Sequence, residues 1–577
     1  MIRRLVSFPV LIVALLLCFQ VAAGQQSSSN TKDKAADAEL RQKAFELLES
    51  LAGQISTLQS AENRARMGSN IAASLWAHDE NRARALFKLV EDDIKLGLQV
   101  NEQTPYGEHT FQVFFKLRED TAERMAQLDP EMALAFLKDT FPLVEEYAAL
   151  PSGGLLPSIA QKEHQLQTRL MRRVGDKNSE VAVALARESL RNGFSRELVS
   201  VLRKASKADA VELYKEVVNK LSDVDLDNWQ NAEFAQYLVE RYTPPAADQS
   251  TYRNLIGIVL AKMSEIGCGN RRPEHDHLAG ICSQMGALIP LMEKFYPAAA
   301  QRFRHWLPED GSHISVRHGY AEVNEIAETG TIDEVLSLTS KYPEIEALIR
   351  HRAIVMAEAA GDLEKAEKIA SEFNGDPQVR ERLTQRVKSY KNLEASAEQQ
   401  WTAAVKNVSE LPLWTQTNLL LGLGHDIALR DKATGLKALA RLSGMIDSLP
   451  PGKEQTAQQI VLAMSYCLAK SDRGFAIIEG LLPKLNELVA AGAKLDGYDA
   501  RYLRDGEWNM TAEGATGNLL TILANNAAYF AWCDFDRAVT LASQFERSEI
   551  RMMAQLKLAQ GILAGPPKRA LGNHRIY

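Results

Sequence analysis

The chain is short of the features that mark disulfide scaffolds, nucleic-acid-binding proteins and membrane-embedded proteins. Only five of its 577 residues are cysteine, too few for a fold that depends on disulfides. It has no long basic run, and its formal net charge of −7 argues against a nucleic-acid partner. Beyond residue 24 no uncharged apolar stretch approaches the roughly 20 residues that cross a bilayer. We therefore expect no membrane span after that point.

The sequence also lacks the short motifs of common active sites. It contains no His-Glu-x-x-His helix, no Gly-x-Ser-x-Gly elbow and no Gly-x4-Gly-Lys-Ser/Thr phosphate loop. Strand-like segments and Asn-Gly hairpins are nearly absent, so no dinucleotide-binding fingerprint has a strand to follow. We predict no catalytic residue and no cofactor. The sequence favours a protein that is not an enzyme.

The first 24 residues have the composition of a secretory signal peptide. Arg3 and Arg4 precede an apolar run from Leu5 to Phe19, and small residues surround Ala23 at the cleavage position. An uncleaved membrane anchor is the alternative, because the run approaches membrane-spanning length. Residues 25–38 are polar and predict a flexible leader. We expect an exported protein of bacterial character, periplasmic or secreted.

The rest of the chain predicts helices almost throughout. Apolar residues recur at spacings of three and four in segments such as "AFELLESLAGQISTLQ" and "FAIIEGLLPKLNELVAA". Proline and glycine gather between such segments, and the stretch 491–508 has the composition of a surface connection. The fold class is all-α. The expected parts are an N-terminal helical array at 39–245, central helices with Cys- and His-containing loops at 246–320, and a C-terminal helical-repeat array at 321–577.

A short pattern recurs along these helices. "GDLEKAEKIASEF" at 361–373 and "CDFDRAVTLASQF" at 533–545 are similar without gaps. In both, an aspartate is followed four residues later by alanine. We predict that the aspartate caps a helix and that the alanine allows the preceding helix to pack closely, so each site is a helical hairpin. The predicted caps are Asp79, Asp129, Asp362, Asp472 and Asp534.

The segment "AEAAGDLEKAEKIA" resembles the turn of a tetratricopeptide repeat, in which small residues precede Gly-Asp and alanine begins the second helix. Tetratricopeptide units recur about every 34 residues. Here the spacing is irregular, from 50 residues between Asp79 and Asp129 to 233 between Asp129 and Asp362. The chain therefore resembles a degenerate tetratricopeptide-like or α-solenoid array of antiparallel hairpins. This resemblance implies a helical superhelix with a groove for partners.

The middle of the chain gathers possible metal ligands. Cys268, His275, His277 and Cys282 could supply a tetrahedral zinc site, although the paired Cys-x2–4-Cys spacing is missing. The other interpretation is a disulfide between Cys268 and Cys282, which an oxidising compartment favours. Cysteines in apolar helical patterns usually behave as small buried hydrophobic residues. This applies to Cys467 and Cys533.

These observations lead to two functional hypotheses. The first is an exported helical-repeat scaffold or adaptor that binds a protein or peptide partner in the periplasm or cell envelope. The second is a metal-binding protein or metal-dependent hydrolase that uses the central His/Cys cluster. Four aromatic residues at helical spacing are expected in the core, with a partner-binding groove as the alternative: Trp76, Trp229, Trp414 and Tyr529. The sequence does not determine the oligomeric state.

Overall fold

The computed structural model describes residues 36–567. Its gaps lie at 100–106, 149–155, 243–248, 270–275, 307–318 and 392–396, and at 321, 325, 328–329, 361, 374, 470, 499–500 and 512–513. The segment expected to be a signal peptide, 1–24, lies outside the described residues, and so does most of the expected leader, 25–38. Both stay predictions.

The described part of the chain is helical almost throughout, which confirms the all-α prediction. Its only strands are β1 (Leu503–Arg504) and β2 (Glu507–Trp508), which pair antiparallel. Among the described helices, none combines the length and apolar character that crossing a bilayer requires.

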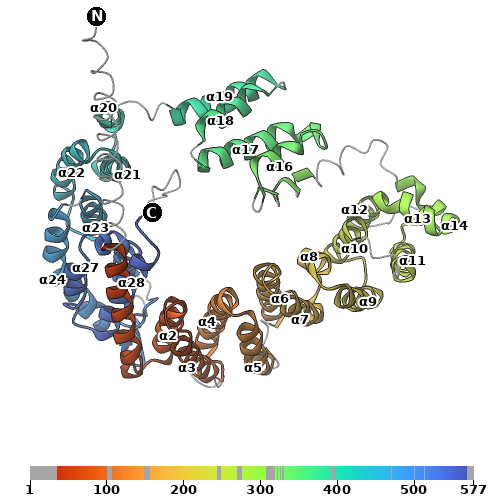
Figure 1. Ribbon diagram of the computed structural model, residues 1–577, viewed down its shortest axis with the longest axis horizontal. Coiled ribbons are helices and arrows are strands. Elements are labelled where there is room, and N and C mark those ends of the chain that lie inside the picture. Colours follow the sequence, from red (N-terminus) through yellow and green to blue (C-terminus); the bar gives the residue numbers. More distant parts are fainter. Residues whose placement is uncertain are drawn as a thin grey trace, which may run out of the picture. The chain divides into compact units, whose positions relative to one another are not determined.

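The chain forms two compact units, whose helices are labelled in Figure 1. The first unit comprises residues 1–100, 108–117 and 396–577, and the second comprises 101–107 and 118–395. This division differs from the boundaries expected near 245 and 320. The reason is that helices from the two ends of the chain pack together in the first unit, where α2 (Ala61–Leu75) contacts α28 (Ser548–Leu563). Sequence patterns of single helices carry no signal for such a long-range pairing.

The second unit is built of stacked helical pairs. Alternate helices contact each other, so that α5, α7, α9, α11 and α13 follow one another in one layer and α6, α8, α10 and α12 in a second. This two-layer stacking is the arrangement of an α-solenoid. The bounds are α5 Pro130–Ala148, α6 Leu156–Val174, α7 Ser179–Asn192, α8 Arg196–Lys204, α9 Lys207–Asp223, α10 Trp229–Arg241, α11 Gln249–Glu265, α12 Asp276–Met285 and α13 Ile289–Phe295.

Five further helices complete the part of this unit that the structure describes as named helices. The tetratricopeptide-like turn around Asp362 joins α17 and α18, which pack together as a helical hairpin. Their apolar residues form one core with α16 and α19. The bounds are α14 Pro297–Ala300, α16 Ile332–Ser337, α17 Glu346–Ala360, α18 Leu363–Ser371 and α19 Pro377–Lys391, with 3-10 turns at Gly286–Leu288, Gln301–Trp306 and Pro343–Ile345.

A buried ion pair in the second unit joins residues of three helices. Arg118, on α4 (Gly107–Leu128), donates from Nη1 to Oε2 of Glu163 at 2.6 Å and from Nη2 to Oε1 at 3.1 Å. Its Nε donates to the hydroxyl of Thr140 at 2.7 Å. All three residues are buried. The bidentate geometry satisfies both charges, which is the condition for tolerating them away from water.

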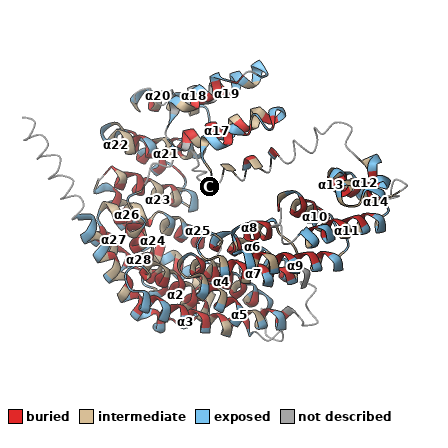
Figure 2. Ribbon diagram, turned by 45° about the vertical axis from the view of Figure 1, so that its right-hand side comes forward, coloured by how far each residue is buried: buried red, intermediate tan, exposed pale blue. Residues whose placement is uncertain are grey.

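The first unit combines the start of the described chain with its end. Residues 36–54 form a helix, and α2 packs against α3 and α28. The remaining helices stack on their neighbours, with α23 in contact with α21, α22, α24, α25 and α26. The bounds are α3 Glu80–Leu98, α20 Ala397–Val408, α21 Leu413–Arg430, α22 Lys432–Asp447, α23 Lys453–Leu468, α24 Arg473–Lys494, α25 Gly514–Asn525, α26 Ala527–Cys533 and α27 Phe535–Ala542, with a 3-10 turn at Ile55–Thr57. Buried residues follow the faces on which neighbouring helices meet (Figure 2).

Four of the five aspartates predicted to be helix caps accept a hydrogen bond from the backbone N–H three residues later. The distances are 2.9 Å at Asp79, 3.0 Å at Asp129, 3.0 Å at Asp362 and 3.1 Å at Asp534. The alanines that follow them, Ala83, Ala133, Ala366 and Ala538, are buried. The hairpin interpretation of the pattern therefore describes these four turns.

Asp472 does not cap α24, and the prediction for this residue is wrong. Its backbone is already helical, with φ −57° and ψ −18°, and its side chain makes no capping hydrogen bond. A capping side chain needs an extended backbone to turn back onto the first helical N–H groups. The carboxylate is instead fully exposed, 3.5 Å from Nη1 of Arg537.

Candidate functional site

An apolar cavity lies among five helices of the first unit, α24 to α28. Its volume is about 50 Å³, within a wider hollow of about 590 Å³ that includes open solvent. Every lining side chain is Phe, Leu, Ile, Met or Ala. The lining residues are Phe475, Ile478, Leu482, Leu520, Leu523, Ala524, Ala527, Phe530, Ala538, Leu541, Ala542, Phe545, Ile550, Met553, Ala554 and Leu558.

The cavity has a buried floor and a more open mouth. Phe475 and Ile550 on the floor are 1% and 2% exposed. The half-buried lining residues are Leu523 and Ala524 at the end of α25, and Met553 and Ala554 in the middle of α28. The mouth therefore lies between α25 and α28, and Met553 supplies a flexible thioether side chain that adapts to different occupants.

Helical spacing explains how the sequence builds these walls. Phe475, Ile478 and Leu482 stand three and seven residues apart and lie on one face of α24. The recurring pattern "CDFDRAVTLASQF" contributes a second wall, because its Asp534-capped helix α27 presents Ala538 and Ala542. Alanine keeps the helices packed while leaving the space that a larger side chain would fill.

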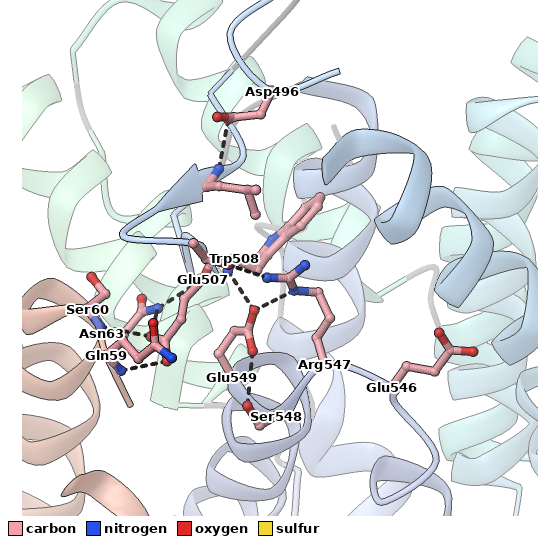
Figure 3. Close-up of polar contacts among 12 residues, drawn as sticks. Gln59, Ser60, Asn63, Asp496, Glu507, Trp508, Glu546, Arg547, Ser548 and Glu549 are labelled. Carbon is pink, nitrogen blue, oxygen red and sulfur yellow. Dashed lines mark hydrogen bonds and ion pairs between the residues drawn. The ribbon is translucent and has the colours of Figure 1, made fainter. Parts of the chain in front are cut away.

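A buried polar network lies beside α28 and holds the β-hairpin against α2 (Figure 3). The carboxylate of Glu507 accepts hydrogen bonds from the backbone N–H groups of Gln59 at 2.7 Å and Ser60 at 3.1 Å. It also accepts one from Nδ2 of Asn63 at 3.1 Å. The same amide nitrogen donates to the carbonyl oxygen of Trp508 at 3.0 Å. These contacts join residues more than 440 positions apart in the sequence.

Glu549 holds the other side of the hairpin. Its Oε1 accepts hydrogen bonds from the backbone N–H of Trp508 and from Nε of Arg547, both at 2.6 Å. Arg547 also donates to the carbonyl oxygen of Gly506 at 2.7 Å. Burial alone would raise the pKa of Glu549, but the hydrogen bonds from Arg547 and Trp508 outweigh it and hold this pKa below its ordinary value. The carboxylate is therefore charged at neutral pH.

The hairpin itself was missed in the stretch expected to be a surface connection. Asp505 and Gly506 turn the chain with positive φ angles of 52° and 80°. Asp-Gly is a strong signal for a two-residue hairpin turn, so the sequence did contain the indication. Trp508, only 1% exposed, shows that this stretch is part of the core. Its strands have two residues each, too few to give an alternating pattern.

The central His/Cys residues do not form a four-ligand site in the structure. Cys268 and Cys282 are joined by a disulfide and are buried, so neither offers a thiolate to a metal. His277 is exposed, and His275 lies outside the described residues. Within the described part of the chain, no group of three or more His, Cys, Asp or Glu side chains could hold a metal ion. The metal hypothesis thus loses two of its four proposed ligands.

The four aromatic residues expected in the core divide into two groups. Trp229 and Trp414 are 38% and 47% exposed, so core packing does not describe them. Trp76 is half-buried, with the guanidinium of Arg84 4.8 Å from its ring centre. Tyr529 is half-buried beside the ring of His425, and burial raises the pKa of its hydroxyl.

Comparisons with known proteins add no assignment of family or function. No protein-family model and no curated protein matches the chain. One similar solved structure is described as a "Circular tandem repeat protein with novel repeat topology and enhanced subunit contact surfaces". The alignment covers 92% of this chain and 96% of that one, with 12% sequence identity and a TM-score of 0.21. A similarity this low carries no argument, and the tetratricopeptide likeness stays a resemblance of the turn around Asp362.

Proposed function

We propose that the protein is an exported, non-enzymatic helical scaffold that binds an apolar segment of a partner protein. The segment's apolar side chains enter the cavity between α24 and α28. The observation that carries this proposal is the mouth between α25 and α28, which opens onto a floor of buried Phe, Ile and Leu side chains. The signal-like composition of residues 1–24 supports export, and the partner is then a periplasmic or cell-envelope protein.

The chemistry of the lining favours a peptide segment over a polar metabolite. Small-molecule sites usually combine apolar walls with a few polar groups that orient the ligand. No polar or charged side chain lines this cavity. An amphipathic helix needs no such group, because its backbone hydrogen bonds are satisfied internally and only its apolar side chains enter the groove. Helical-repeat scaffolds commonly bind their partners through such surfaces.

Selection of peptides on the full chain tests this function. A phage-displayed library of random peptides is selected against the wild-type protein and against Ala554→Trp, whose indole fills the mouth. Ala85→Trp is the matched control, because Ala85 is exposed on α3 and does not line the cavity. We expect enriched peptides with apolar residues at spacings of three, four and seven, and we expect Ala554→Trp alone to lose them.

Two results contradict the proposal. One is a selection that enriches no peptide, and the other is a set of peptides that bind wild type and Ala554→Trp equally. Circular dichroism and thermal unfolding establish that the variants are folded. If Ala554→Trp does not fold, Ala524→Trp fills the same mouth from α25.

A further inference from the structure

The two cysteines outside the Cys268–Cys282 disulfide lie next to each other in the first unit. Cys467 belongs to the last turn of α23, and Cys533 is the final residue of α26. These helices pack together, and the two thiols lie close enough to interact with each other. Their positions in the sequence, each in an apolar helical pattern, gave no indication of this contact.

The surroundings of the pair hold Cys467 in place and leave Cys533 accessible. Cys467 is 2% exposed, and a Cβ atom on Gly474 would lie 2.6 Å from its sulfur. Because residue 474 has no side chain, the start of α24 closes directly over this thiol. Cys533 is half-buried, so it is the more accessible of the two cysteines to an external reagent.

We propose that Cys467 and Cys533 form a second disulfide, which ties α23 to α26. A disulfide requires the two sulfurs to approach to about 2.05 Å, and the packing of α23 against α26 already brings the two thiols together. Cys533 can make this movement, because it is the last residue of its helix and the backbone of Asp534 is already extended, with φ −158° and ψ 103°. The bond encloses α24 and α25, two helices that line the apolar cavity, and therefore fixes one side of the candidate site.

The oxidant in this reaction is a small-molecule or protein disulfide. The thiolate of Cys533 attacks one sulfur of the oxidant and forms a mixed disulfide, releasing the first thiolate. The thiolate of Cys467 then attacks the sulfur of Cys533 and releases the second. Two cysteine thiols lose two electrons and two protons, and the oxidant is reduced to two thiols. The hydrogen bond with Cys533 and burial raise the pKa of the Cys467 thiol, so we expect this second attack to be the slow step.

Peptide mapping of the folded full chain tests the proposal. The protein is purified without reductant, incubated with oxidised glutathione, denatured with N-ethylmaleimide present and digested with trypsin. We expect the Cys467 peptide to be covalently joined to the Cys533 peptide, lighter than their sum by two hydrogen atoms and unlabelled by maleimide. The Cys268–Cys282 disulfide in the same digest establishes that oxidation occurred. Cys467→Ser and Cys533→Ser must each remove the new cross-linked peptide.

Several results overturn the proposal. Maleimide on both Cys467 and Cys533 in a digest that contains the Cys268–Cys282 bond shows that the pair does not close. A stable glutathione adduct on Cys533 beside a free Cys467 shows that the second attack fails in the folded chain. Cross-links from Cys467 to Cys268 or Cys282 show that the thiols react only after the structure opens.

Discussion

Replacing Glu507 by glutamine should loosen the contact between the hairpin and the start of α2. The carboxylate accepts three hydrogen bonds, with the N–H of Gln59 at Oε1 and two donors, the N–H of Ser60 and Nδ2 of Asn63, at Oε2. A glutamine amide offers one acceptor oxygen and one NH2 group. Either orientation places that NH2 against at least one of the three donors. The side chain is only 8% exposed, so water cannot substitute freely.

The size of the expected loss of stability follows from the hydrogen-bond donors that Glu507→Gln leaves unpaired. A buried donor without an acceptor costs about 1–3 kcal/mol, and hydrogen bonds to a charged acceptor are about 1.5–3 kcal/mol each. We expect Glu507→Gln to destabilise this contact by about 2–4 kcal/mol. If local opening controls exchange, the amides of residues 59 and 60 should exchange with deuterium at least about 30-fold faster, because about 1.4 kcal/mol is a factor of ten.

Hydrogen–deuterium exchange of peptides covering residues 55–64 measures this effect without requiring two-state unfolding of the whole chain. Glu546→Gln is the matched control, because Glu546 is an exposed glutamate that points away from the network in Figure 3. Its exchange should stay at the wild-type rate. If Glu507→Gln and Glu546→Gln exchange equally, Glu507 does not hold the start of α2 and the reasoning is wrong.

Three further predictions concern stability. Asp534→Ala should lower the free energy of unfolding by about 1 kcal/mol. Asp472→Ala removes no cap, so its free energy of unfolding should stay within about 0.5 kcal/mol of wild type. Equal losses of stability for the two variants in denaturant titrations would contradict the assignment of caps. Arg118→Ala leaves Glu163 buried without its partner and should lower the free energy of unfolding by about 3–5 kcal/mol. Arg172→Ala, at an exposed ion pair, should lower it by at most about 1 kcal/mol. A small loss of stability in Arg118→Ala would show that the buried charge is hydrated. Because the folded pKa of Glu549 lies below its ordinary value of 4.5, its stabilising contribution is present above that pH and is lost as the pH falls through the folded pKa. The difference in melting temperature between wild type and Glu549→Gln should therefore become smaller below about pH 4.5. A difference that stays constant with pH would show that the pKa of Glu549 is not lowered by folding.

Local features of the sequence predicted much of the architecture but little of the site. The cap at Asp362 was predictable because the carboxylate bonds to a backbone N–H only three residues away. Asp472 has the same downstream alanine, yet its helical backbone prevents capping. The Asp-Gly turn at 505–506 was a signal for a hairpin that the sequence contained. The hydrogen bonds from the backbone N–H groups of Gln59 and Ser60 to Glu507 could not be predicted, because no local pattern connects those segments.

By itself, the sequence determined that this chain is helical and how most of its hairpins turn, because helical periodicity and capping act over one or two turns of backbone. The tertiary structure alone decided which distant helices meet. It brought α2 to α28, aligned five apolar faces around one cavity and placed Cys467 beside Cys533. The physical reason is that burial of apolar surface is non-directional. An amphipathic helix encodes which face it buries, and only the packing of the whole unit selects the partner for that face.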